Sequence, residues 1–151
     1  MKLTHTMIVM GIGSFAIQYF LMSPIMVRHR LDITNNLGKA YLSMTMALFM
    51  IFLEVMMHDH QYNIFSLNTY VILASLFVLF VYLYRNQVAI NDAQYLEGMV
   101  EHHSMALLTS QEILKKTDDY NVSKLAKNII QTQEDEIKIM RELLEKKANN
   151  N

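Results

Sequence analysis

Two adjacent histidines and several methionines are the residues of this 151-residue chain whose types and spacing could do chemistry. His102 and His103 lie in a stretch with helical periodicity, and Met99 precedes His103 by four residues, which places those two on one helix face. The chain holds 13 methionines and no cysteine. Imidazole nitrogen combined with thioether sulfur suits Cu(I), whereas thiolate sites and disulfides are excluded.

A second amphipathic stretch, expected to run to about Lys147, carries the other candidate donors. Gln133 and Glu136 interrupt its apolar stripe, and burying an amide or a carboxylate is costly unless each finds a partner. In an antiparallel hairpin with its turn near residue 119, the residue numbers of two facing positions add up to about 238. His103 is therefore level with about Asp135. One site could then be enclosed by Met99, His102, His103, Gln133, Glu136 and Met140.

Copper(I) is the metal that this donor set favours. Zinc is a weaker candidate because it accepts imidazole and carboxylate but has little use for thioether sulfur. A carboxylate-bridged di-iron centre uses Glu-x-x-His pairs, and this tail contains none. In the alternative, the two histidines have a purely structural role: one is hydrogen-bonded in the core, and the other is solvated at the edge of the core.

Three apolar runs, residues 7–27, 40–57 and 65–84, predict three transmembrane helices. Each approaches the roughly 20 residues that a helix needs to cross the hydrocarbon core. A buried soluble bundle is the alternative for such runs. The charges favour a bilayer, because residues 1–90 carry 8 charged side chains and residues 91–151 carry 19.

The polar tail is predicted to form two antiparallel helices, neither apolar enough to span a membrane. Asn91 with Asp92 is a plausible N-cap for the first helix, and residues 117–121 have the composition of a turn. Ser123 or Asn121 is expected to cap the second helix. The fold class is therefore all-α, with a membrane domain over residues 1–88, a helical hairpin over 89–148 and a frayed end at 149–151.

Three crossings place the N-terminus and the tail on opposite sides of the membrane. Lys2 then lies on the side of the loop 58–63, and four basic residues lie on the side of the tail, which favours a cytoplasmic tail in a bacterial inner membrane. The tail has 8 basic against 11 acidic residues, which excludes a basic footprint for nucleic acid. The four basic residues are Arg28, Arg30, Lys39 and Arg85.

The second apolar run contains Glu54, and an intramembrane carboxylate is a functional candidate by default. Methionines share its helix face, and two histidines follow the run, so this span could pass Cu(I) toward or away from the site in the tail. In the simpler interpretation, the methionines fill packing gaps and Glu54 reaches the headgroups. The candidate path comprises Met46, Met50, Glu54, Met57, His58 and His60.

Two motifs in the tail resemble the domain-of-unknown-function 305 family. Asp92 followed by Met99-Val100-Glu101-His102-His103-Ser104-Met105-Ala106 fits the family pattern "D…M…HH..A". Leu125-Ala126, Ile129-Ile130, Gln133, Glu136-Ile137 and Met140 fit "lA..I…Q..EI..M".

The resemblance covers about Asp92 to Leu144 and implies a ferritin-like helical bundle that binds copper and serves copper tolerance. It implies His102, His103, Met99 and Met140 as ligands. Glu136 and Met105 complete the candidate set, and Gln133 and Asp92 are expected to support the ligands without binding the ion.

A lone helix pair has too little core for independent stability. Met105, Leu108 and Ile139 also lie off the seam between the two helices. We therefore expect a homo-oligomer, for which a dimer is the simplest closed form.

The sequence thus predicts a membrane-anchored copper-binding protein that sequesters Cu(I) or hands it to a copper chaperone or exporter. It is not expected to be an enzyme, because Ser104 and Ser110 lie near His103 without an oxyanion-hole turn. One alternative is a metal-free membrane protein whose hairpin only assembles. The other is a subunit of a metal transporter.

Overall fold

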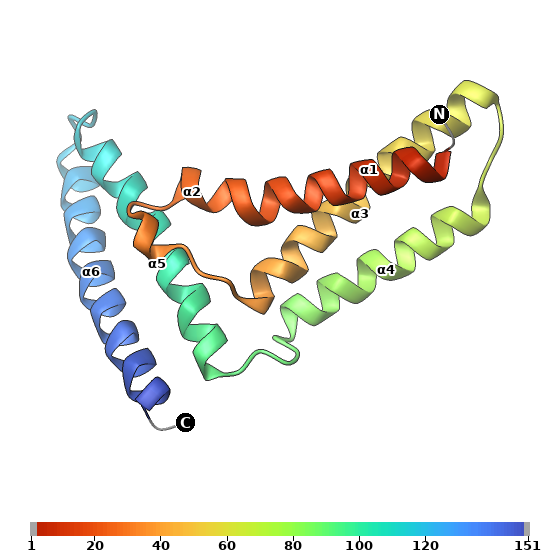
Figure 1. Cartoon of the computed structure of the whole chain (residues 1–151). Helices are drawn as coiled ribbons and strands as arrows, with labels where there is room; N and C mark the ends of the chain where they lie inside the picture. The colour runs from red at the N-terminus through yellow and green to blue at the C-terminus, as the bar shows by residue number, and fades with distance from the viewer. Residues whose placement is uncertain (1–2, 150–151) are drawn as a thin grey trace. The chain divides into compact units, whose positions relative to one another are not determined.

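The computed structural model describes residues 3–149, and all regular elements in that range are helical (Figure 1). The prediction of an all-α fold is confirmed. The helices are α1 (Leu3–Ala16), α2 (Met22–Met26), α3 (Leu37–Tyr62), α4 (Leu67–Arg85), α5 (Asp92–Leu114) and α6 (Tyr120–Asn149), with a π-helical turn at Ile17–Leu21 and a 3-10 turn at Arg30–Asp32.

Contacts divide the described residues into two units. The first comprises Met1–Met22 and Leu37–Ala89 and is called the apolar unit below. The second comprises Ser23–Asn36 and Ile90–Asn151 and is called the hairpin unit. Ser23–Asn36, the connecting segment, thus belongs with the hairpin and not with the membrane domain predicted over residues 1–88.

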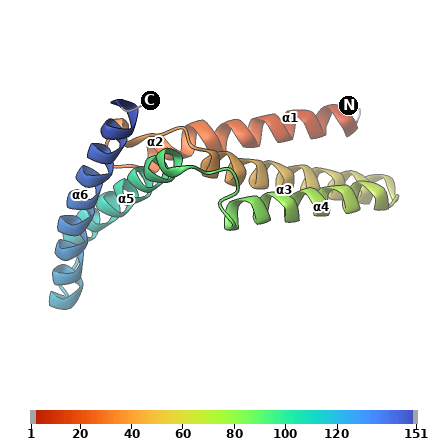
Figure 2. The same ribbon diagram turned by 90° about the horizontal axis from the view of Figure 1, so that it is seen from below.

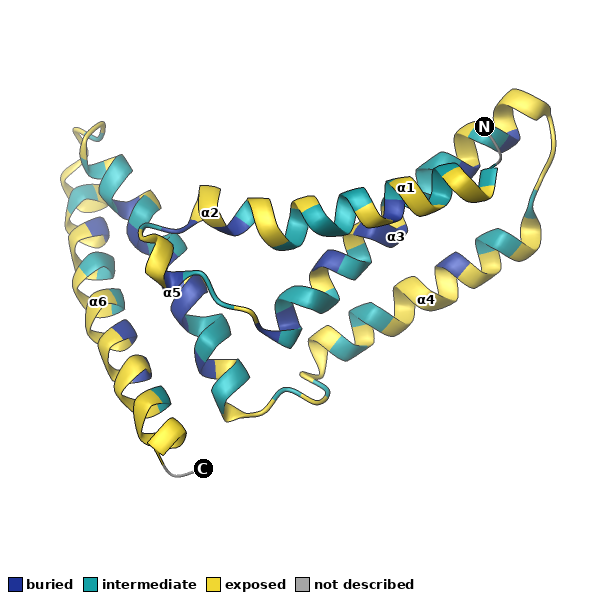
Figure 3. Cartoon of the chain, in the orientation of Figure 1, coloured by how far each residue is buried: buried dark blue, intermediate teal, exposed yellow. Residues whose placement is uncertain are grey.

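Three helical stretches of the described chain are long and apolar enough to cross a membrane: Leu3–Met26, Leu37–Tyr62 and Leu67–Arg85. The ends of these three helices lie within five residues of the ends of the predicted apolar runs. Most of their apolar side chains point outward; Ile12 is 67% and Val78 is 66% exposed (Figure 3). A soluble bundle would bury such side chains, whereas helices in a bilayer present them to lipid.

The second of these helices, α3, is longer than predicted because His58 and His60 continue it and do not begin a loop. The buried carboxylate of Asp59 accepts hydrogen bonds from the Ser66 backbone N–H (2.6 Å) and hydroxyl (2.9 Å). Asn63 then adopts a left-handed conformation with φ 50°, a common way to end a helix. The last turn of α3 therefore stabilises the connection to α4.

Gly11 lies where α1 packs closely on α3. A Cβ atom at this position would lie 2.8 Å from Cδ1 of Ile51, whereas nothing lies within 4 Å of a Cβ at Gly13. Small residues allow helix backbones to pack closely in membranes.

The substitution Gly11→Leu is expected to destabilise the packing of α1 on α3 by about 1–3 kcal/mol, because the larger side chain must displace Ile51. Gly13→Leu on the same helix is the matched control, since that position is open. Unfolding of the purified protein by titration with a denaturing detergent measures both. Equal losses in the two variants would contradict the assigned contact.

The hairpin unit is built on α5 and α6, which run antiparallel side by side (Figures 1 and 2). Asn91 caps α5 as predicted, its side-chain oxygen accepting from the Gln94 N–H at 3.0 Å. The predicted cap of α6 was wrong: Asp119 accepts from the N–H groups of Asn121 (2.7 Å) and Val122. The core between the helices consists of Leu96, Val100, Leu107, Ile137 and Met140.

Candidate metal site

His103 and Glu136 meet between the two hairpin helices. His103 is buried, and its Nε2 lies 2.7 Å from Oε2 of Glu136. Its Nδ1 lies 2.8 Å from the backbone carbonyl oxygen of Met99. A carbonyl can only accept, so Nδ1 carries a proton and Nε2 is the nitrogen that faces Glu136. The residue numbers of this pair add up to 239, which confirms the predicted pairing of positions whose numbers add up to about 238.

The two thioethers of the predicted site lie on one side of this pair, one helical turn along the hairpin. Met99 lies one turn before His103 on α5, and Met140 lies one turn after Glu136 on α6. Met140 is a buried member of the hairpin core, and the half-buried Met99 packs against the same core. The structure therefore places two sulfur-bearing side chains level with each other, one helical turn from the imidazole and the carboxylate.

The Glu136 side chain lies at the rim of the hairpin, where it is 48% exposed, compared with 11% for His103. The carboxylate could therefore rotate toward solvent without leaving a cavity in the core. Within residues 3–149, no group of three or more His, Asp or Glu side chains is placed to share a metal ion. Within this range, His103 and Glu136 therefore supply two donors, and Met99 and Met140 lie one helical turn from them.

The other predicted residues lie farther from the pair. His102 is exposed, and its ring centroid lies 6.4 Å from that of His103. Met105 is half-buried and lies about 200° around the helix from His103. Gln133 is half-buried on the seam, three residues before Glu136.

Asp92 lies at the open end of the hairpin, where Lys147 Nζ donates to it at 2.7 Å. This hydrogen bond, together with the lysine charge, lowers the pKa of the Asp92 carboxyl. A lowered pKa stabilises the fold above the unfolded pKa, and that stability is lost as the pH falls through the folded value. The contribution is small because the two side chains are 45% and 80% exposed.

The candidate membrane path lies along α3 in the apolar unit. Met46 and Met57 are 45% and 56% exposed, whereas Met50 and Glu54 are half-buried. This face of α3 is thus only partly covered by the other helices of its unit. At the end of α3, His58 is half-buried beside Asp59 and His60 is exposed.

A buried carboxylate on the connecting segment was not identified from the sequence. Asp32 is only 2% exposed, accepts a hydrogen bond from the Ser104 hydroxyl at 2.6 Å, and pairs with Arg141 of α6. The Arg28 backbone N–H also donates to the Ser104 hydroxyl oxygen, at 2.9 Å. The connecting segment is thus bound to both hairpin helices next to His103.

A second buried carboxylate, Glu101, binds the same segment from α5. It accepts hydrogen bonds from the Ser23 hydroxyl and from the Thr34 N–H (3.1 Å) and hydroxyl (3.0 Å). Glu101 and Ser104 occupy the face of α5 that turns away from the core, and both are buried. The connecting segment therefore covers one face of the hairpin.

The only sequence signal for this contact is weak. Glu101 and Ser104 lie three residues apart, with Glu97 four residues before Glu101, so they form a polar stripe behind the apolar one. Such a stripe is normally solvated, and nothing in the local spacing indicates what covers it. The partners Asp32 and Arg141 are separated by 109 residues.

These features define an all-α protein with three helices of membrane-spanning length and an imidazole–carboxylate pair inside a two-helix hairpin. Residues 83–150 match the family described as "Domain of unknown function (DUF305)". The chain is also similar to "Uncharacterized protein L153" of Acanthamoeba polyphaga mimivirus, at 31% identity over 141 residues that cover 93% of this chain and 91% of that protein. Residues 83–150 thus belong to the DUF305 domain family, and the chain over most of its length is related to the mimivirus protein. No solved structure matches it significantly.

Proposed function

We propose that this chain is a membrane-anchored protein that binds Cu(I) in the hairpin and sequesters it or passes it on, without turning over a substrate. The observation that carries this proposal is the orientation of His103. Its Nδ1–H donates to the Met99 carbonyl oxygen, and its Nε2 points to Glu136. Metal-binding histidines commonly donate the other ring N–H to a carbonyl or carboxylate, which fixes the tautomer and the ring.

The surrounding donors favour a soft ion. Met99 and Met140 lie one helical turn from His103 and Glu136 on their respective helices, and thioether sulfur with imidazole selects Cu(I) over harder cations. Zinc is the less suitable ion at this level of the hairpin. His102 is an exposed imidazole next to the pair and is suited to receive the ion from a chaperone or release it to an exporter.

Glu136 controls access to Nε2 in this proposal. Its carboxylate occupies the position next to Nε2 that the ion would take. Since the Glu136 side chain is half exposed, it rotates aside at little packing cost, and it remains close enough to offset the charge of the bound cation.

Methionine-to-leucine substitutions test the thioether ligands, because they remove sulfur and nearly conserve volume. We expect Met140→Leu and Met99→Leu each to weaken Cu(I) binding by about 10-fold or more, the cost of losing roughly 1.4 kcal/mol of ligand interaction. Competition with a chromophoric Cu(I) chelator, on the full chain in mild detergent, measures the affinity. Met56→Leu, at an exposed position of α3, is the control. Affinities unchanged in all three variants would contradict a sulfur-bound ion.

A metal-free structural role is the second candidate, and one observation favours it: both ring nitrogens of His103 already have hydrogen-bond partners. In this role the pair closes the hairpin, and the protein serves as a membrane-anchored assembly module. The two candidates differ in Cu(I) affinity, which only the first one requires.

We propose that the hairpin unit lies on the cytoplasmic side of a bacterial inner membrane. Three spans put the segment after the first span and the chain after the third on one side, as the contacts of Asp32 and Glu101 within the hairpin unit require. Arg28, Arg30 and Arg85 lie on that side, which agrees with the positive-inside bias.

A further inference from the structure

The connecting segment has an inner side that binds the hairpin and an outer side that is exposed. Ser23 and Asp32 are buried on the inner side, where they bind side chains of α5. Leu31, on the outer side, is 87% exposed, the highest exposed fraction among the large apolar side chains of the described residues. The outer side comprises Ile25 (69%), Met26, Arg30 and Leu31.

The chain ties this outer side to the ends of two helices of membrane-spanning length. One helix ends at Met26 and the next begins at Leu37, so Leu31 lies five residues from the first and six from the second. Even a fully extended chain covers no more than about 18 Å over five residues. The 3-10 turn at Arg30–Asp32 shortens this reach further. If these helices span a bilayer, the outer side stays near its surface.

Arg30 gives the outer side a charge that fits lipid phosphate. Its exposed guanidinium makes no hydrogen bond or ion pair within residues 3–149. The neighbouring charges are already paired, since Arg28 binds Glu134 and Asp32 binds Arg141. An exposed leucine beside a free arginine is typical of an interfacial anchor, in which the apolar side chain enters the headgroup boundary and the guanidinium binds phosphate.

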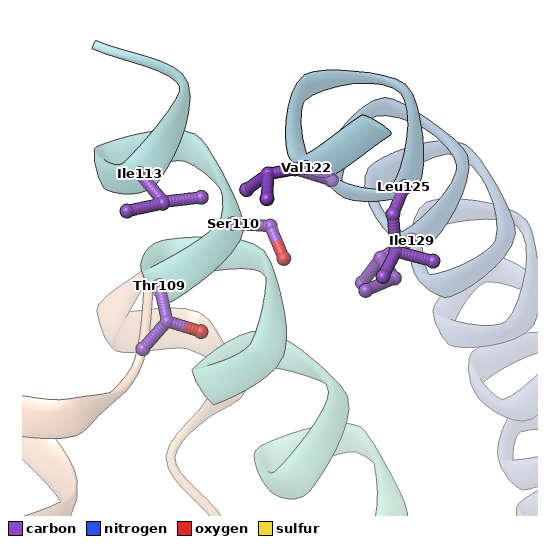
Figure 4. Close-up of a pocket in the computed structure, with 7 residues that line it drawn as sticks. Thr109, Ser110, Ile113, Val122, Leu125 and Ile129 are labelled. Atoms are coloured by element: carbon purple, nitrogen blue, oxygen red, sulfur yellow. The ribbon is translucent and has the colours of Figure 1, made fainter. Parts of the chain in front are cut away.

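A second exposed apolar surface of the hairpin unit has no such charge. It is the groove near the turn, lined by Ile113 of α5 and by Val122 and Leu125 of α6 (Figure 4). None of the residues that line this groove is charged. Leu125 lies about 180° around α6 from Glu134, which binds the connecting segment. The groove therefore faces away from the outer side of that segment.

We propose that the outer side of the connecting segment is a membrane-contact surface, at which Leu31 inserts between lipid headgroups and Arg30 binds the phosphate of an anionic phospholipid. Ile25 and Met26 continue the contact to the end of the first span. The contact presupposes the membrane anchoring proposed above. Because the inner side of the same segment binds α5, the contact holds the hairpin unit next to the bilayer.

Quenching by spin-labelled lipid tests the contact, because a dye can be attached to a single introduced cysteine in a chain that has none. The full chain is reconstituted in vesicles of phosphatidylcholine and phosphatidylglycerol. A polarity-sensitive dye on Leu31→Cys should shift to the blue and be quenched by lipid with a nitroxide near the headgroup. Leu125→Cys, at a leucine that is 61% exposed in the same unit, is the matched control and should show neither effect.

Val78→Cys, at an exposed position of α4, reports the anchoring itself and should be quenched by lipid with a nitroxide deep in the acyl chain. Quenching at Val78 without quenching at Leu31, or equal quenching at Leu31 and Leu125, would overturn the contact and leave the anchoring intact. Absence of quenching at all three positions would overturn the anchoring as well.

The charge of Arg30 provides a second readout. With the dye at residue 31, spin-labelled phosphatidylglycerol should quench more strongly than spin-labelled phosphatidylcholine. Arg30→Gln is expected to lower this ratio about 5-fold, which corresponds to the ~1 kcal/mol per basic residue near an anionic surface. Arg30→Lys should retain the preference, and Lys116→Gln, exposed at the hairpin turn, is the control. An unchanged ratio in Arg30→Gln would contradict the assignment of Arg30 to lipid phosphate.

Discussion

Replacing Asp32 by alanine is expected to destabilise the hairpin unit by about 1–3 kcal/mol, because the buried hydroxyl of Ser104 loses its hydrogen-bond acceptor. Asp32 is 2% exposed and also pairs with Arg141, but the Arg141 side chain is 47% exposed and stays solvated in the variant, so the lost ion pair adds little. The connecting segment should then detach from α5.

Thermal unfolding followed by circular dichroism, together with protease cleavage at the exposed Arg30, measures both effects of Asp32→Ala. Asp118→Ala removes a solvent-exposed carboxylate from the turn and is the control, with an expected change within about 0.5 kcal/mol. If Asp32→Ala were no less stable than Asp118→Ala and equally resistant to protease, the connecting segment would not be part of the hairpin unit.

The second large effect is expected at His103 in the absence of metal. His103→Ala should cost about 2–4 kcal/mol, because it leaves a cavity beside the core and removes the hydrogen bonds to Met99 and Glu136. His102→Ala should change stability by no more than about 0.5 kcal/mol, since that side chain is exposed. Chemical denaturation in the presence of a chelator makes the comparison. Equal effects of the two substitutions would mean that the buried contacts of His103 do not form.

Hydropathy and helical periodicity predicted most of the fold. The three long apolar helices and the antiparallel pair after residue 90 are each encoded within a few turns of sequence, so local spacing is sufficient to find them. The pairing of His103 with Glu136 was predicted to within one residue because a short turn sets which positions face each other. The N-cap of α6 was predicted at the wrong residue, because Asp119, Asn121 and Ser123 are all favourable N-cap residues and only the backbone geometry decides among them.

The contacts of the connecting segment could not be predicted in this way. Asp32 and Glu101 resemble solvated carboxylates in the sequence, and their partners lie 67 to 109 residues away along the chain. Burial of these groups depends on tertiary structure that no local pattern reports.

Covering one face with the connecting segment also changes how the hairpin reaches a stable core. Asp32 is buried against the hairpin, so the helix pair gains a third element from its own chain.

The most direct test of the proposed function is a Cu(I) competition titration of the full chain in mild detergent, with His103→Ala alongside. We predict about one ion per chain for the unaltered protein and at least a 100-fold loss of affinity in the variant, about 2.7 kcal/mol. His60→Ala, at an exposed position of α3, should bind like the unaltered protein. Weak Cu(I) binding that is equal in all three proteins would contradict the account and leave His103 and Glu136 as a structural pair.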